Sequence, residues 1–240
     1  MENKENNGNI SNGGGNRMVS QLFALLGILF TACLLLSNLI ARKVFAIGPI
    51  ELPASVILFP VTYILGDVFT EVYGFKKASG IIWSGFLCNA FAVLVYWATL
   101  ALPAADHWTD QAAFVTVIGP SFRVFVASLL GYLFGSFSNA MVLSRLKVVT
   151  GGKRLWVRTI VSTLVGEAFD TVIFIAVAFA GVEGMGPVDL VWMIVFEYIF
   201  KVLYEAVFTP VTYWVVRRVK IIEGVDVYDE GVSYNVFKLK

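Results

Sequence analysis

Six long apolar stretches constrain the fold of this chain more than any other feature. A helix needs about 20 predominantly apolar residues to cross a hydrocarbon core about 30 Å thick. The six stretches are 19–40, 54–73, 80–102, 120–143, 160–182 and 188–216. They are continuous, whereas the strands of a transmembrane barrel alternate apolar and polar residues. We therefore expect an all-α integral membrane protein with six transmembrane helices.

The low content of charged residues agrees with this class. Only 15% of the 240 residues are charged and 58% are hydrophobic, whereas about a quarter of the residues of an average soluble domain are charged. The formal net charge is +1, so nucleic acid is not expected as a partner. The expected partners are the lipid bilayer and a small molecule, and the sequence leaves a homo-oligomer open.

The two ends of the chain differ from the apolar middle. Residues 1–17 are rich in Asn, Gly and Ser, a composition that cannot bury enough surface to become ordered. We expect a disordered tail over 1–17, a six-helix membrane domain over 18–220 and a second tail over 221–240. Basic residues concentrate in the 2–3 loop, the 4–5 loop and the C-terminal tail, which predicts that both termini lie in the cytoplasm and that the protein is a multi-pass protein of the cell membrane. Arg42 and Lys43 are exceptions, on the outer side.

A faint internal repeat relates the two halves of the chain. Ser37-Asn38 ends the first stretch and Ser138-Asn139 lies near the end of the fourth, while Gly66 to Glu71 in the second resembles Gly166 to Thr171 in the fifth. Both offsets are about 100 residues. Two halves of three spans each must run in opposite directions, so the pattern indicates a 3+3 inverted repeat, which secondary transporters often have. Chance similarity between apolar helices is the alternative.

Ionisable residues interrupt the apolar stretches. They are Asp67, Glu71, Arg123, Glu167, Asp170, Glu197, Lys201 and Glu205. Charged groups within a membrane are costly and usually mark a functional site. Structural ion pairs between helices are the alternative, but six acids face only two bases. We therefore expect a polar cavity in which at least one carboxyl group exchanges a proton.

Other residues support a cavity rather than a solid apolar bundle. Asn38 and Asn139 are polar residues of the spans, and Pro60 interrupts the second span, where the lost backbone hydrogen bond needs another partner. Aromatic residues such as Phe59 and Tyr63 could stack on a planar ligand. No nucleophile–base set, phosphate-binding glycine loop or zinc spacing is present, so we expect no enzyme, no cofactor and no metal site.

Four segments carry a family resemblance. They are LFPVTYILGDVFTEVYG at 58–74, FRVFVAS at 122–128, STLVGEAFDT at 162–171 and EYIFKV at 197–202. The chain resembles the queuosine precursor transporter family, also known as a vitamin uptake family, over nearly all of residues 18–220. Asp67, Arg123, Asp170 and Lys201 match charged positions of the family pattern, whereas Glu71, Glu167 and Glu197 stand where other members vary.

The resemblance implies a substrate and a fold. The substrate class is 7-cyano-7-deazaguanine or 7-aminomethyl-7-deazaguanine, and the fold is similar to the substrate-binding subunits of energy-coupling-factor transporters. A carboxylate can accept two hydrogen bonds from the N1–H and 2-amino groups of such a base. We expect Asp170 or Glu167 to read this edge, with Arg123 and Lys201 holding the acids.

The remaining expected site residues are Asp67, Asn38, Asn139, Tyr63 and Phe59 in substrate binding, and Asp67 or Glu71 in proton coupling. Facilitated diffusion is the alternative to proton coupling. The sequence also leaves open a substrate-binding subunit of an ATP-driven importer of vitamins or nucleobases and a membrane receptor that transports nothing.

Overall fold

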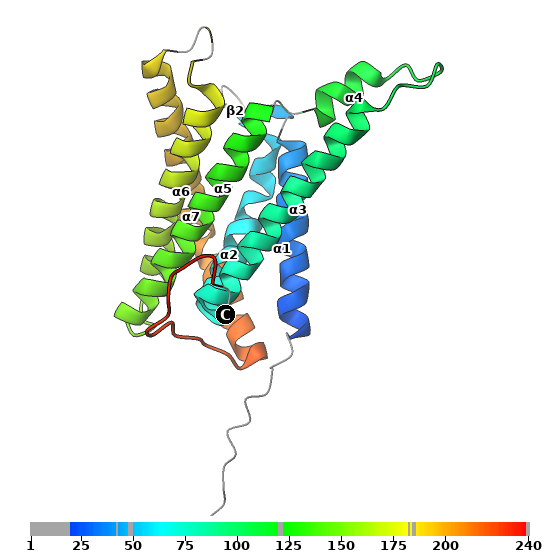
Figure 1. Cartoon of the computed structure of the whole chain (residues 1–240). Coiled ribbons are helices and arrows are strands. Elements are labelled where there is room, and N and C mark those ends of the chain that lie inside the picture. Colours follow the sequence, from blue (N-terminus) through cyan, green and yellow to red (C-terminus); the bar gives the residue numbers. More distant parts are fainter. Residues whose placement is uncertain are drawn as a thin grey trace, which may run out of the picture.

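The computed structural model describes residues 20–41, 43–47, 50–119, 122–181, 183 and 186–238. Six helices of 15 residues or more lie side by side in a bundle (Figure 1). They are α1 (Gln21–Ile40), α2 (Phe59–Tyr73), α3 (Phe75–Ala101), α5 (Phe122–Val149), α6 (Leu155–Phe179) and α7 (Pro187–Glu223). The tail expected over 1–17 lies outside the described residues, as does Arg42.

Three departures from the expected helices have local causes. The second helix begins only at Phe59, because the 3-10 turn η1 (Ala54–Ile57) precedes it; before that turn, β1 (Val44–Ile47) pairs antiparallel with β2 (Ile50–Pro53). The fold is therefore not purely helical. A short helix, α4 (Gln111–Ile118), forms in the expected 3–4 loop, and α7 continues to Glu223, where Gly224 adopts a positive φ of 61° that ends it.

Four segments are long and apolar enough to cross a membrane: Gln21–Ile40, Phe75–Ala101, Gln111–Val149 and Leu155–Phe179. The other two long helices do not meet that standard. Helix α2 has only 15 residues, which corresponds to about 22 Å of helix, and α7 carries Glu197, Lys201 and Glu205 along its length. Length and composition thus support four of the six expected spans.

Helix α2 forms the centre of the bundle. It contacts α1, α3, α5 and α7, and every residue from Asp67 to Tyr73 is buried. Phe69 lies between two rings of α1, with its ring centroid 5.4 Å from that of Phe23 and 6.0 Å from that of Phe30. A helix that is buried on all sides has no contact with water. Its two carboxylates, Asp67 and Glu71, therefore have to find their partners inside the protein.

Glycines bring α5 and α6 into close contact. A Cβ atom at Gly135 would lie 2.8 Å from the Cβ of Asp170 and 3.0 Å from the carbonyl oxygen of Gly166, and one at Gly166 would lie 2.8 Å from the Cβ of Asn139. Small residues let membrane helices approach at backbone distance, where van der Waals packing holds them together. This seam fixes the position of Asp170 against α5.

The C-terminal segment 224–238 is folded against one end of the bundle, where α1 also begins (Figure 1). Val227 donates its backbone N–H to the carbonyl of Val72 at 3.1 Å. The buried Asp229 accepts hydrogen bonds from the Phe75 N–H at 2.8 Å and the Ser144 hydroxyl at 2.5 Å. We call this segment the C-terminal strap, because it ties together the ends of α2, α3 and α5.

Candidate functional site

The ion pairs between the described residues gather in two places. The midspan cluster consists of Glu167 and Asp170 on α6 and Glu197 and Lys201 on α7. The terminal cluster consists of Glu71, Lys147, Arg158, Lys220 and Asp226, at the end of the bundle that the C-terminal strap covers.

Lys201 is the centre of the midspan cluster. Its Nζ lies 2.7 Å from Asp170 Oδ2, 3.0 Å from Glu197 Oε1 and 3.3 Å from Glu167 Oε2. It also donates to the Thr171 hydroxyl at 3.3 Å. Helical spacing explains the geometry: Glu197 precedes Lys201 by four residues on α7, and Glu167 and Asp170 are three apart on α6, so each pair shares a helix face.

The midspan cluster has more negative than positive charge. One ammonium group faces three carboxylates, and Oε1 of the buried Glu167 has no partner among the described residues. The cluster is open on one side, because the side chains of Asp170 and Glu197 keep 26% and 36% of their exposure. Unpartnered buried carboxylate oxygens are costly. The arrangement can accept hydrogen bonds from a ligand that is rich in N–H donors.

A second group of acids lies between α2 and α7. Asn139 of α5 donates to Asp67 Oδ1 at 3.1 Å, and Glu205 is close enough to Asp67 for their charges to interact. Asp67 Oδ2 and Glu205 Oε1 are buried without a hydrogen-bond partner among the described residues. Two neighbouring carboxyl groups of this kind can share or pass on a proton.

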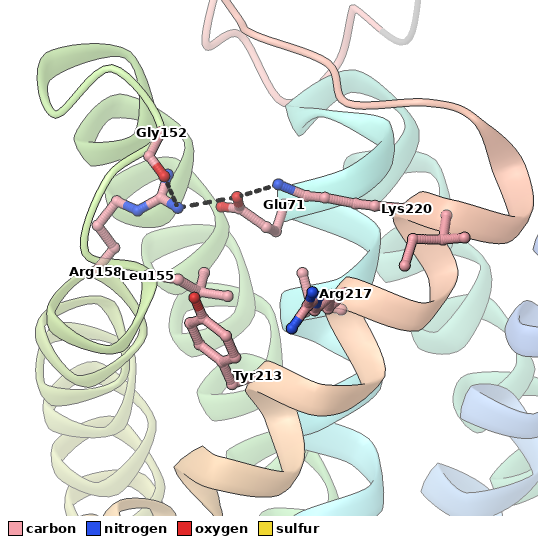
Figure 2. Close-up of a pocket in the computed structure, with 9 residues that line it drawn as sticks. Glu71, Gly152, Leu155, Arg158, Tyr213, Arg217 and Lys220 are labelled. Carbon is pink, nitrogen blue, oxygen red and sulfur yellow. Dashed lines mark hydrogen bonds and ion pairs between the residues drawn. The ribbon is translucent and has the colours of Figure 1, made fainter.

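The terminal cluster surrounds Glu71 with cations (Figure 2). Glu71 Oε1 lies 2.8 Å from Lys220 Nζ, 3.0 Å from Arg158 Nη2 and 3.8 Å from Lys147 Nζ. Lys147 and Lys220 both also pair with Asp226, which follows α7. Burial acts to raise the pKa of Asp226, but hydrogen bonds and charge from the two lysines outweigh it, so this pKa lies below its usual value. Four helices and the strap are joined here.

Several expected site residues lie elsewhere. Arg123 is exposed and donates to the carbonyl oxygens of Val177 and Ala180 at the end of α6, so it does not hold the acids as we expected. Asn38 donates to Asn89 at 2.6 Å and contacts neither cluster. Tyr63 is half-buried on α2. The side chain of Phe59 lies outside what the structure describes.

Two cavities flank the bundle. One of about 490 Å³ lies beside Glu71, Arg158 and Lys220 in the terminal cluster. The other, of about 520 Å³, is lined by Leu39, Ile40, Lys43, Thr116 and Val117. Neither is lined by a member of the midspan cluster. In the described part of the chain no group of three or more His, Cys, Asp or Glu residues could hold a metal ion.

Sequence reasoning missed the terminal cluster, apart from Glu71. Lys147, Arg158 and Lys220 stood out only as basic residues near the ends of spans, where they were used to predict orientation. The available signal was Glu71 itself, because a buried acid at the end of a span requires a cation from a neighbouring helix end.

Comparisons with known proteins place the chain in a transporter family. The family model described as "Putative vitamin uptake transporter" matches residues 53–215. The chain is 30% identical over 195 residues to a protein of Bacillus subtilis (strain 168) named "Probable queuosine precursor transporter", covering 80% of this chain and 82% of that protein. No solved structure matches. The chain therefore belongs to this vitamin uptake transporter family and is a membrane transporter, not an enzyme.

Proposed function

We propose that this protein imports 7-deazaguanine precursors of queuosine, with the midspan cluster as the substrate site. The observation that carries the proposal is the surplus of carboxylate in that cluster, three acids around Lys201, on one open side. The name of the Bacillus relative supports the choice of substrate class. The protein is proposed to lie in the cell membrane with six spans and both termini in the cytoplasm.

The roles follow from the contacts of each acid. Glu167 Oε1 has no partner among the described residues and Oε2 is held only by Lys201 at 3.3 Å, so this carboxylate is suited to accept from the N1–H and 2-amino groups of a deazaguanine once the lysine moves aside. Asp170 is held by Lys201 at 2.7 Å and lies against Gly131 and Gly135. Asp170 therefore sets the position of Lys201. If the bond between Asp170 and Lys201 breaks, Asp170 as well as Glu167 can accept hydrogen bonds from the substrate.

Proton coupling is proposed to use Asp67 rather than Glu71. Asp67 keeps one oxygen without a partner and has Glu205 nearby. Glu71 is instead occupied by Arg158 and Lys220. If the coupling exists, uptake into proteoliposomes should follow an imposed pH gradient in the unmodified protein and lose that dependence in Asp67→Asn. Uptake that ignores the gradient in both proteins would favour facilitated diffusion.

The substrate is tested by ligand-dependent stability of the purified chain in detergent. A ligand that binds the folded state raises the unfolding temperature by mass action. We expect a rise with the two deazaguanine bases, a smaller one with guanine, which presents the same N1–H and 2-amino edge, and none with riboflavin or biotin. A rise with a vitamin alone would replace the proposed substrate and keep the transporter.

The site is tested by Asp170→Asn and Glu167→Gln, with Asp106→Asn in the exposed loop before α4 as the matched control. We expect the first two to abolish uptake at normal expression and the control to leave it unchanged. Uptake by liposomes that contain only this chain separates a self-sufficient carrier from a binding subunit that requires an ATPase. Normal uptake by both site variants would refute the assignment.

A further inference from the structure

The cavity of about 490 Å³ beside the terminal cluster has walls of two kinds (Figure 2). Arg158, Arg217 and Lys220 supply cationic groups, and Leu155, Val216 and Ile221 supply apolar ones. Arg158 lies near the start of α6, whereas Arg217, Lys220 and Ile221 lie near the end of α7. The cavity therefore lies between the start of α6 and the end of α7, and it has one charged wall and one apolar wall.

The cationic side is not neutralised by the protein. Among the described residues, Lys147, Arg158 and Lys220 pair with two carboxylates, Glu71 and Asp226, and Arg217 adds a fourth cation. Arg217 has no ion pair within the described ranges. A surplus of positive charge in a partly buried cavity attracts an anion.

Arg158 supplies an independent observation. Its side chain is only 1% exposed, and only its Nη2 is bonded, to Glu71 at 3.0 Å and to the Gly152 carbonyl at 3.2 Å. Its Nε and Nη1 have no hydrogen-bond partner within the described part of the chain. Buried guanidinium N–H groups normally have acceptors, and phosphate oxygens match their geometry well.

We propose that this cavity binds the headgroup phosphate of an anionic phospholipid, with an acyl chain along its apolar wall. Arg217 is the first residue after the apolar run 188–216, so the cationic groups stand where α7 leaves the hydrocarbon. Ile221, 68% exposed, continues that wall on the outside. Basic pockets between helices at a membrane surface bind lipid headgroups of this kind. A soluble phosphate would use only the cationic side.

Glu71 has a defined part in this site. Its carboxylate holds Arg158 and Lys220 at 3.0 and 2.8 Å, and so keeps the two cations in position before any lipid binds. The site is separate from the midspan cluster, because no residue that lines the cavity belongs to that cluster. Lipid binding is therefore expected to act on the terminal end of the bundle whatever the transporter carries.

The test compares two neighbouring arginines in the full chain. Arg217 lines the cavity, whereas Arg218 lies over the Trp214 ring at 5.7 Å. Both arginines are exposed, so Arg217→Gln and Arg218→Gln should both fold. The two substitutions also change the net charge by the same amount. The binding of phosphatidylglycerol, phosphatidylcholine and inorganic phosphate to delipidated protein in detergent is followed by native mass spectrometry and by unfolding temperature.

We expect phosphatidylglycerol to stabilise the unmodified protein and Arg218→Gln, and to bind about tenfold more weakly to Arg217→Gln, as loss of one charge-assisted contact predicts. Equal stabilisation by phosphatidylcholine would overturn the proposal, as would equal weakening in both variants, which indicates general attraction to a basic surface. Stabilisation by inorganic phosphate at the same site, without a gain from the lipid, would overturn the lipid as occupant.

Discussion

The midspan and terminal clusters contain the same kinds of side chain in opposite proportions. In the first, Lys201 alone faces three carboxylates, two of which keep part of their exposure. In the second, Glu71 and Asp226 are surrounded by lysines and arginines, and Glu71 is completely buried. A surplus of acid that is open on one side suits exchange of a donor-rich ligand. A cation-rich junction of four helices suits a fixed connection.

The surrounding structure strengthens this contrast. The C-terminal strap covers the terminal cluster and adds Asp226 and the carbonyl of Val227, which accepts from Lys147 at 2.7 Å. No segment in the described ranges covers the midspan cluster in this way, and its position depends on the α5–α6 seam behind Asp170. Changes in the terminal cluster should lower stability with little effect on substrate affinity, whereas changes in the midspan cluster should abolish transport in addition to any loss of stability.

The largest expected effect comes from Lys201→Met. It leaves three carboxylates without their shared cation, and removal of one partner from a buried ion pair costs about 4 kcal/mol. We expect a lower free energy of unfolding in detergent and no measurable uptake. Lys153→Met, in the exposed loop before α6, is the control and should change neither. Uptake at the unmodified rate by Lys201→Met would show that the midspan cluster is not the site.

Glu71→Gln tests the terminal cluster in the same way. Arg158 and Lys220 lose the charge that they share, and we expect a loss of about 3 kcal/mol in unfolding free energy. The affinity for substrate, measured by calorimetry, should stay within twofold of the unmodified protein. A large loss of affinity with little loss of stability would reverse the roles that we give to the two clusters.

Gly135→Ala tests the seam behind the midspan cluster. The new Cβ would lie 2.8 Å from Asp170 Cβ and 3.0 Å from the Gly166 carbonyl, so α5 and α6 must separate at a cost of about 2 kcal/mol. Uptake should fall because Asp170 moves with α6. Gly80→Ala on α3 has open space around the new atom and should be neutral or slightly stabilising. An equal effect of both changes would argue against the seam.

The smallest effect is expected from Asp226→Asn, read as a function of pH. The folded pKa of Asp226 lies below its usual value, so its stabilisation is present above about pH 4 and is lost as pH falls through the folded pKa. Because the side chain is 43% exposed, the stabilisation is at most about 1 kcal/mol. At pH 7 the variant should unfold at a slightly lower temperature than the unmodified protein. Between about pH 5 and pH 3 its stability should fall less steeply with decreasing pH. If the variant loses stability in acid as steeply as the unmodified protein, Asp226 does not have this role.

The sequence predicted the long helices well because continuous apolar runs report burial in lipid directly. Helix α1 begins and ends within two residues of the expected stretch, whereas α3 and α6 each begin five residues before theirs and α5 ends six residues after its own. It failed where apolar character and helix length diverge. The expected stretch 54–73 begins with the 3-10 turn η1, which follows the β1–β2 hairpin, so α2 is shorter than the stretch. At the other end, α7 continues through Arg217, Arg218 and Lys220, which are good helix formers.

The candidate site was predictable only within single helices. The spacing of Glu197, Lys201 and Glu205 predicts one stripe, which agrees with the ion pair between Glu197 and Lys201 at 3.0 Å. Which acid of α6 meets Lys201 depends on how two helices pack, and the carbonyl partners of Arg123 depend on where α6 ends. No spacing in one helix contains that information. The inverted repeat and the likeness to energy-coupling-factor subunits stay predictions.

The C-terminal strap has a consequence for biosynthesis. Its residues follow all of the described helices along the chain and are translated after them, yet Asp229 supplies acceptors to the start of α3 and to Ser144 of α5. One end of the bundle can therefore close only after α7 and the strap that follows it have left the ribosome. A chain that stops after α7 would lack the contacts of Asp229 and Val227 that fasten this end of the bundle.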